Sequence, residues 1–260
     1  MKEVAIVTGA STGIGYEIAK LFASERTNLL VAARDEQKLL NIKKLFEEQY
    51  GISVLTVATD LTSIEGVQAI HDTVNANSLT VRYLVNNAGF GDYGPFINSS
   101  IGKYRDMIGL NILSLTELTY YYGKEMVKQG KGRILNVASM AGLQPDPNFA
   151  VYGATKAYVI SMSEAVHKEF ENTGVTVTVL SPGATASNFM ERANMNDAKL
   201  YEKGVMSSAD VAREGYHGMM KGKLHVIPGF KNKILGFLSG ITPPGKLRLS
   251  IAANIMAAKT

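Results

Sequence analysis

Tyr152 and Lys156 lie four residues apart in the segment Val151-Tyr-Gly-Ala-Thr-Lys156, and this pair is the part of the sequence best suited to chemistry. In a helix, residues at i and i+4 share one face. A fixed ammonium beside a phenol favours the phenolate, which otherwise forms only near pH 10. The pair therefore predicts a proton donor and acceptor for a substrate oxygen. Ser139, Asn111 and a glycine-rich turn near the N-terminus add to this pattern.

The glycine-rich turn is Thr8-Gly-Ala-Ser-Thr-Gly-Ile-Gly15, which follows the first apolar run and precedes a helical pattern. Its glycines allow a tight turn and a close approach to a ligand, and the N-terminus of the next helix presents free N–H groups to a pyrophosphate. A turn that binds nothing is the alternative, but a first βαβ unit is the context in which such turns hold a dinucleotide. The expected cofactor contacts are Gly9, Ser11, Thr12, Gly13, Ile14 and Gly15.

The end of the second apolar run bears on the choice of cofactor. This run ends in Ala32-Ala33-Arg34, where a protein that prefers NAD usually carries an acid for the ribose hydroxyls. Arg34 can pair with a 2′-phosphate, and Lys38 lies one helical turn further on. Asp35 could accept from the ribose, but we expect it to cap the next helix. The sequence therefore favours NADP(H).

Short apolar runs alternate with longer helical patterns along the whole chain. The runs are apolar at successive positions, as expected of strands covered on both faces. The expected strands are residues 4–8, 28–33, 53–59, 81–86, 133–138, 175–180 and 224–227. The connections are long enough for crossover helices, for example residues 15–24, 36–50 and 152–171. This alternation predicts an α/β fold, with one doubly wound parallel sheet of about seven strands and helices on both faces.

Several motifs together resemble the short-chain dehydrogenase/reductase (SDR) family. The residues that carry the resemblance are Thr8–Gly15, Asp60-Leu61, Asn86-Asn-Ala-Gly89, Asn111, Ser139, Tyr152-x-x-x-Lys156 and Pro182-Gly183. They occur in order over residues 1–230, and several motifs at matched spacing are far more specific than one alone. Residues 152–183 and the segment Val226–Phe230 resemble more narrowly the bacterial DltE-like oxidoreductases of that family.

The resemblance implies a single Rossmann-fold domain over residues 1–230 and a role for each matched residue. Tyr152 would be the acid in reduction and the base in oxidation, with Lys156 favouring its phenolate and holding the nicotinamide ribose. Ser139 would hydrogen-bond the substrate oxygen. Asn111 would kink its helix and hold a water that links Lys156 to solvent. The other implied cofactor contacts are Asp60 and Leu61 beside the adenine, Asn87, Ala88 and Gly89 along the cofactor, and Pro182, Gly183 and Thr185 near the carboxamide.

Apolar and methionine side chains dominate the segments expected beyond the carboxyl ends of the strands, where ligands bind. These segments are residues 90–96, 140–149 and a substrate lid at 184–206. They contribute Phe90, Tyr93, Phe96, Met140, Leu143, Phe149, Phe189, Met190, Met195 and Met206. The pattern favours a small apolar ketone, aldehyde or secondary alcohol as substrate. The alternative is a non-catalytic dinucleotide sensor, which would not need the Ser139, Tyr152 and Lys156 set.

Composition excludes several other classes of function. The 260 residues contain no cysteine, and the four histidines are scattered without ligand spacing, so we expect no metal site. Residues 1–220 hold 20 Lys and Arg against 23 Asp and Glu, whereas residues 221–260 hold seven Lys and Arg and no acid. The net charge of +4 is thus a property of the C-terminal tail, and no nucleic-acid partner is expected. The start of the chain does not have the layout of a signal peptide, so we expect a cytoplasmic protein.

Residues 231–260 form a basic, amphipathic extension of the same domain. Leu247, Ile251 and Ile255 recur every four residues and would share one helical face, and Pro243-Pro244 separates this helix from the one before it. We expect the extension to cover the substrate pocket or to pack on a second subunit, which favours a homo-oligomer. A peripheral contact with an anionic membrane is the less favoured alternative.

Overall fold

A seven-stranded parallel sheet organises the computed structural model, which describes residues 3–193, 195, 205–241 and 245–255. The strand order is β3-β2-β1-β4-β5-β6-β9. The chain therefore begins in the middle of the sheet, runs to one edge, and then crosses to build the other half. The reversal between β1 and β4 is a topological switch point, and open α/β sheets bind their ligands beyond the carboxyl ends of the strands at such a point.

All seven expected strands form, and each end lies within one residue of its predicted position. The strands are β1 Glu3–Thr8, β2 Asn28–Ala33, β3 Val54–Ala58, β4 Thr80–Asn86, β5 Gly132–Val137, β6 Val175–Leu180 and β9 His225–Val226. A short second pairing, between β7 Thr185–Ala186 and β8 Met206–Ser207, was not expected from the sequence. It fixes both ends of the segment predicted as a lid, of which residues 194 and 196–204 lie outside the described residues.

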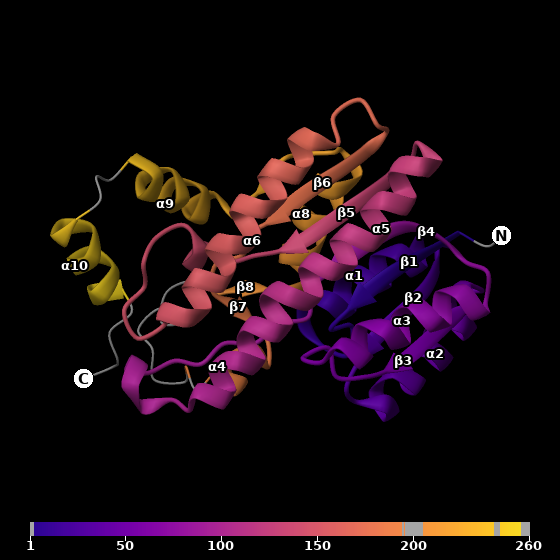
Figure 1. The fold of residues 1–260 in the computed structure, drawn as a ribbon, viewed down its shortest axis with the longest axis horizontal. Coiled ribbons are helices and arrows are strands. Elements are labelled where there is room, and N and C mark those ends of the chain that lie inside the picture. The colour runs from indigo at the N-terminus through magenta and orange to yellow at the C-terminus, as the bar shows by residue number, and fades with distance from the viewer. Residues whose placement is uncertain (1–2, 194, 196–204, 242–244, 256–260) are drawn as a thin grey trace.

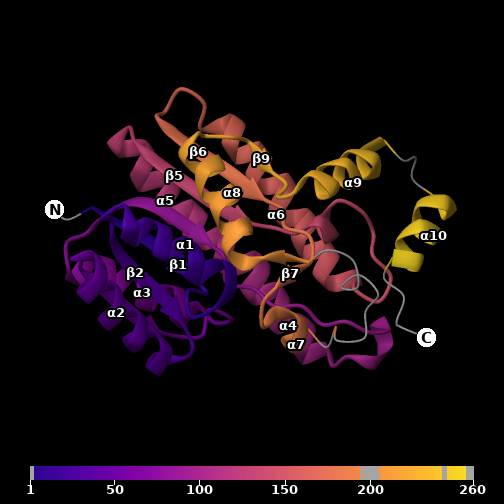
Figure 2. The same ribbon diagram turned by 180° about the vertical axis from the view of Figure 1, so that it is seen from behind.

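Helices cover both faces of the sheet, as Figures 1 and 2 show from opposite sides. The helices are α1 Gly13–Ser24, α2 Glu36–Tyr50, α3 Ile64–Ala76, α4 Ile101–Ile108, α5 Leu115–Gln129, α6 Ala150–Glu169, α7 Phe189–Arg192, α8 Ser208–Met220, α9 Phe230–Ile241 and α10 Lys246–Ile255. Alternate residues of β1 point to opposite faces of the sheet, and each set packs against a different layer of helices. Ala5 and Val7 pack with α1, α2 and α8, whereas Val4 and Ile6 pack with α3 and α5.

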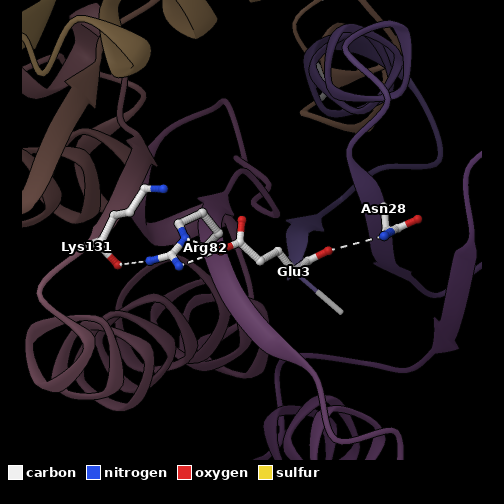
Figure 3. A network of polar contacts seen from close by, with 4 residues as sticks. All are labelled: Glu3, Asn28, Arg82 and Lys131. Atoms are coloured by element: carbon white, nitrogen blue, oxygen red, sulfur yellow. Dashed lines mark hydrogen bonds and ion pairs between the residues drawn. The ribbon is translucent and has the colours of Figure 1, made fainter. Parts of the chain in front are cut away.

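A polar network closes the end of the sheet opposite the glycine-rich turn (Figure 3). Arg82 of β4 donates from Nη2 to Glu3 Oε1 at 2.6 Å and from Nη1 to the carbonyl oxygen of Lys131 at 2.6 Å. Asn28 Nδ2 of β2 donates to the carbonyl oxygen of Glu3 at 3.4 Å. The Arg82 guanidinium also holds the pKa of Glu3 below its usual range. The network thus ties the starts of three strands together, and the carboxyl ends remain open for a ligand.

The edge strand β9 is held by a chain of polar side chains. Ser181 Oγ lies 2.8 Å from His225 Nε2, and His225 Nδ1 lies 3.1 Å from Glu164 Oε1 on α6. Ser181 is fully buried, so this chain anchors the strand and does not present a nucleophile. The position of β9 matters because helix α9, which lines part of the cavity described below, begins four residues after this strand.

Helices α9 and α10 lie at the opposite end of the molecule from β2 and β3 (Figures 1 and 2). The predicted helix around Leu247, Ile251 and Ile255 forms as α10, while Pro243 and Pro244 lie outside the described residues. Two apolar side chains of α9, Phe230 and Phe237, are more than two-thirds exposed, at 77% and 68%. Of the helices that the structure describes, none combines the length and hydrophobicity needed to cross a membrane.

Candidate active site

A cavity of about 970 Å³ lies beyond the carboxyl ends of the strands. We divide its lining into two regions. The cofactor half is lined by Gly9, Ser11, Thr12, Gly13, Ile14, Ala33, Arg34, Asp35, Thr59, Asp60, Leu61, Asn87, Ala88 and Gly89. The substrate half is lined by Phe90, Met140, Leu143, Gln144, Asp146, Phe149, Asn188, Phe189, Met195, Lys231, Asn232, Leu235, Leu238 and Ser239. Between the two halves lie Ser139, Tyr152, Lys156, Pro182, Gly183 and Thr185.

The glycine-rich turn is locked against the end of β4. Asn87 Nδ2 donates to the carbonyl oxygens of Thr8 at 2.9 Å and Gly9 at 3.2 Å, and Thr8 Oγ1 accepts from the backbone N–H groups of Asn87 and Ala88 at 3.0 Å each. Gly9 has φ = +65°, a region that favours glycine. Gly15 does not line the cavity. A Cβ there would collide with the carbonyl oxygen of Gly9 and with Asn87, so Gly15 permits the turn without facing the ligand.

The end of β2 presents an exposed Arg34 to the cofactor half. Asp35 caps α2, because its Oδ1 accepts from the backbone N–H of Lys38 at 3.0 Å, as the sequence predicted. Its Oδ2 pairs with Lys38 Nζ at 2.9 Å. Lys38 does not line the cavity in this structure, so its proposed contact with a phosphate stays a prediction. Arg34 is therefore the cation that this segment brings to the site.

Asn111 supports the cavity wall from behind. It lies in a π-helical turn, Gly109–Ser114, that joins α4 to α5 and breaks the regular helix, in line with the expected kink. Its Nδ2 donates to the carbonyl oxygen of Phe90 at 3.0 Å and to Thr155 Oγ1 at 3.0 Å, and its Oδ1 accepts from the N–H of Phe90 at 3.2 Å. Gly89 lies in front of Asn111, and a larger residue would be crowded there, because its Cβ would lie 3.0 Å from Asn111 Oδ1.

Lys156 is buried beside the ring of Tyr152. Its Nζ donates to the carbonyl oxygen of Val137 at 2.8 Å and lies 5.6 Å from the centre of the Tyr152 ring. Burial lowers the pKa of Lys156 to about 8, because removal from water disfavours its charged form. Both residues come from the first two turns of α6, so the helix sets their spacing. The i, i+4 geometry predicted from the sequence is therefore present.

Tyr152 and Ser139 enter the cavity from rigid elements. The Tyr152 ring stacks on Phe149 with 4.3 Å between ring centres, and Phe189 lies 5.4 Å away on another side. Ser139 follows β5, and its Oγ accepts from the N–H of Ala141 at 3.2 Å, which caps a short 3₁₀ turn at Met140–Gly142. The structure thus brings a phenol, a hydroxyl and an ammonium to the lining of one cavity.

Six of the ten apolar residues expected on the substrate side line the cavity, and four do not. Phe96 is 61% exposed and stacks on Tyr104, and Tyr93 packs against Phe149 from outside. Met206 contacts Asn232, whose Nδ2 lies 3.7 Å from its sulfur. Met190 is the fourth expected residue that does not line the cavity. The cavity is also lined by Lys231, Leu235 and Leu238 of the amphipathic extension, and by residues that were not singled out from the sequence, which are Gln144, Asp146, Asn188, Asn232 and Ser239.

Helix α9 forms part of the cavity rim. Leu235 and Leu238 line it although they remain 51% and 46% exposed, which places them at its open edge. The amphipathic pattern of this helix was visible in the sequence, and covering the pocket was one of its two expected roles. Asp146 had no comparable signal, because it lies in a loop between two prolines, Pro145 and Pro147.

Comparisons with known proteins agree with this geometry. Residues 3–198 match the sequence profile of the family described as short chain dehydrogenase. An uncharacterised oxidoreductase of Staphylococcus epidermidis is 31% identical over 213 residues, which cover 81% of this chain and 90% of that protein. A short-chain dehydrogenase from Sphingobium yanoikuyae, solved in complex with NADPH, is 26% identical with a TM-score of 0.80, and the match covers 95% of this chain and 98% of that one. The bulky-bulky ketone specific alcohol dehydrogenase from Comamonas testosteroni is 25% identical with a TM-score of 0.78, over 95% and 97% of the two chains.

Proposed function

Because the chain is a dinucleotide-dependent oxidoreductase that belongs to the short chain dehydrogenase family, we propose that it transfers a hydride between NADP(H) and an apolar ketone, aldehyde or secondary alcohol. One observation carries the proposal. A single cavity is lined at one end by the glycine-rich turn and Arg34, and in its middle by Ser139, Tyr152 and Lys156. The binding elements and the reacting groups are thus adjacent.

The cofactor half fits a phosphorylated dinucleotide. The turn carries no Cβ at Gly9 and Gly13, both at positive φ, and leads directly into the N-terminus of α1, where N–H groups and the helix dipole favour an anion. Arg34 is exposed at the rim, while Asp35 is engaged by Lys38 and by the helix cap. A guanidinium in this position, beside an acid that is already engaged, favours a 2′-phosphate. The relative from Sphingobium yanoikuyae, which was solved with NADPH, supports the same choice.

Proton transfer would be the task of Tyr152. When bound, the nicotinamide supplies the hydride for the carbonyl carbon. Negative charge then builds on the carbonyl oxygen, which needs one proton donor and one further hydrogen-bond donor, and the hydroxyls of Tyr152 and Ser139 can fill these roles. Lys156 would stabilise the phenolate left behind, and in the oxidation direction the same phenolate would take the proton from the alcohol.

The remaining site residues would support this reaction. Asn111 would hold Phe90 and Thr155 in place through its three hydrogen bonds, and would position the water that links Lys156 to solvent. Asp60 and Leu61 would border the adenine. Asn87, Ala88 and Gly89 would lie along the cofactor, and Pro182, Gly183 and Thr185 would lie beside the carboxamide.

The substrate half favours an apolar carbonyl compound of some size. Leu143, Phe149, Phe189 and Leu238 line it from three different segments. Aromatic, aliphatic and methionine side chains of this kind accept varied apolar shapes. The relative from Comamonas testosteroni, described as specific for bulky-bulky ketones, is consistent with this choice.

The direct test is to mix the protein with NADPH and then with a panel of carbonyl compounds. We expect a change in NADPH fluorescence on binding, followed by its oxidation when an apolar ketone or aldehyde is added. The second candidate function, a non-catalytic dinucleotide sensor, predicts the binding without any oxidation. Absence of NADPH binding at micromolar concentrations would contradict both.

We also propose a homo-oligomer in which residues 231–260 extend the same domain. The exposed face of α9, with Phe230, Ile234 and Phe237, is apolar and would be covered by a second subunit. Sedimentation of the purified protein with and without anionic vesicles tests this assignment. A monomer that pellets with vesicles at low salt and is released at high salt would instead support the membrane alternative.

A further inference from the structure

Asp146 is a buried acid in the substrate half of the cavity. Asp146 is only 6% exposed, yet it lines the cavity together with apolar residues such as Leu143 and Phe149. Within the part of the chain that the structure describes, the polar side chain bonded to it is Gln144, whose Nε2 donates to Asp146 Oδ1 at 3.1 Å. Burying a carboxylate with so few partners costs free energy. A group that is retained at such a cost calls for an explanation.

The usual structural roles of a buried acid do not account for Asp146. The N-cap of α6 is Phe149, without a side-chain cap, and the turn before it is closed by the backbone, where the N–H of Phe149 donates to the Asp146 carbonyl oxygen at 3.1 Å. The carboxylate therefore caps no helix. None of the described Lys or Arg side chains forms an ion pair with it, and the buried cation of the cavity, Lys156, donates to the carbonyl oxygen of Val137. Asp146 lines a cavity that a ligand would fill.

The chemistry of the pair specifies the group that it would bind. A carboxylate oxygen only accepts hydrogen bonds, while the Gln144 amide still has a second N–H to donate. A hydroxyl group both donates and accepts, so it can satisfy the two side chains together. We propose that Asp146 and Gln144 form a polar subsite for a substrate hydroxyl, on the same molecule as the carbonyl that faces Tyr152 and Ser139. The substrate class is then an apolar hydroxyketone, or the corresponding diol in the oxidation direction. This inference rests on the proposed function and narrows it.

The test compares substrates that differ at one group. Ketones of equal size that carry a distal hydroxyl, methyl or amino group are given to the wild-type protein, and to Asp146→Leu, Asp146→Asn and Gln144→Leu variants. We expect wild type to favour the hydroxyketone over its methyl analogue by roughly ten- to a hundredfold in kcat/KM, mostly through KM, which is the range for a hydrogen bond to a charged group. Asp146→Leu should bring this ratio close to one. Asp146→Asn should keep part of it, because the amide oxygen still accepts.

A matched control is Asp106→Leu, which removes an exposed acid of α4 outside the cavity and should leave the hydroxyl preference intact. NADPH affinity is measured for every variant, so that a misfolded protein is recognised. The subsite would be overturned if kcat/KM in wild type were nearly the same for the hydroxyketone and its methyl analogue. It would also be overturned if Asp146→Leu kept the same preference for the hydroxyketone as wild type. If wild type instead prefers the amino compound, and Asp146→Asn loses this preference, the subsite binds an ammonium group. That result would also overturn the proposal of a hydroxyl subsite.

The outcomes separate this inference from the proposed function. If wild type reduces none of the ketones, the proposed function fails, and isothermal titration calorimetry of the hydroxy and methyl compounds then tests the subsite alone. Tighter binding of the hydroxy compound that is lost in Asp146→Leu supports the subsite even in that case. Equal binding of the two compounds by wild type contradicts it.

Discussion

The two halves of the cavity are built in different ways. The cofactor half is a set of backbone turns at the ends of adjacent strands, held together by hydrogen bonds such as those from Asn87 to Thr8 and Gly9. The substrate half is assembled from side chains of the loop after β5, the segment around α7, and α9. Backbone turns at the strand ends therefore shape the first half, whereas packing of side chains from loops and helices shapes the second.

Tyr152 lies between the two halves of the cavity. Its ring packs in a cluster with Phe149 and Phe189 of the substrate half, and it lies one helical turn before Lys156, which is buried against Val137 at the end of β5. The contrast predicts that changes in the cofactor half act on dinucleotide binding, changes in the substrate half act on substrate choice, and changes at Tyr152 act on the rate.

The largest effect is expected where the two halves meet. Tyr152→Phe removes only the hydroxyl, so turnover should fall by about 10²- to 10⁴-fold, the range for loss of a general acid. NADPH affinity should change little, because the cofactor half is untouched. Steady-state kinetics and a fluorescence titration measure the two quantities. Tyr158→Phe on the same helix is the control, since its hydroxyl lies 3.1 Å from Thr116 outside the cavity. Turnover of Tyr152→Phe at the wild-type rate would exclude the proposed acid.

A second change probes the rigidity of the cofactor half. Gly15→Ala places a Cβ against the carbonyl oxygen of Gly9, and the backbone has to move. We expect a loss of about 3 kcal/mol in the free energy of unfolding, typical of overpacking, together with loss of NADPH binding. Gly51→Ala is the matched control. It also has positive φ, but nothing lies within 4 Å of its Cβ, so it should cost only about 1 kcal/mol and leave NADPH binding intact. Equal effects of the two changes would contradict the rigid turn.

The choice between the two dinucleotides should depend on one side chain of the cofactor half. Arg34→Ala should weaken NADPH binding by roughly ten- to over a hundredfold, which corresponds to a charge-assisted hydrogen bond of about 1.5–3 kcal/mol, and should spare NADH. Lys38→Ala should have a smaller effect, because Lys38 Nζ pairs with Asp35. Titrations with both dinucleotides measure this. Equal affinity of the wild type for NADH and NADPH would mean that Asp35 reads the ribose.

The smallest effect is expected in the substrate half, on stability. Burial raises the pKa of Asp146 to about 6 from its ordinary value of 3.8. The folded state therefore favours the protonated acid, and the free energy of unfolding should fall as pH rises from about 4 to about 6. Asp146→Asn removes this penalty, so the variant should be about 1–2 kcal/mol more stable than wild type at pH 7.5, with a smaller difference at pH 4.5. Urea unfolding at both pH values tests this, and a variant that is less stable than wild type at pH 7.5 would contradict it.

The same contrast explains what could be predicted from the sequence. The seven strands were predictable because buried parallel strands are short apolar runs, and the cap at Asp35 follows a local rule. The π-helical turn at Gly109–Ser114 was not predictable from local pattern. It depends on distant contacts, since Gly109 packs against the carbonyl oxygen of Thr62 and Ser114 Oγ donates to that of Leu61.

The substrate half was predicted only in part, because its residues are brought together by packing. Phe149 and Phe189 were expected there, but Phe96 points to solvent and Met206 packs on Asn232. Asp146 lies in an irregular loop, where no periodicity shows which way a side chain faces. The narrower resemblance to DltE-like oxidoreductases stays a prediction for the same reason, since it concerns the substrate.

The most direct measurement of the central claim is the transfer of label from the cofactor to the substrate. The protein is incubated with NADPH that carries deuterium in place of both C4 hydrogens and with a ketone that it reduces, and the alcohol product is analysed by mass spectrometry. We predict one deuterium on the former carbonyl carbon, with the hydroxyl proton exchangeable with water. An alcohol without deuterium, or NADPH that binds but is not oxidised by any carbonyl compound, would contradict the assignment as a hydride-transferring oxidoreductase.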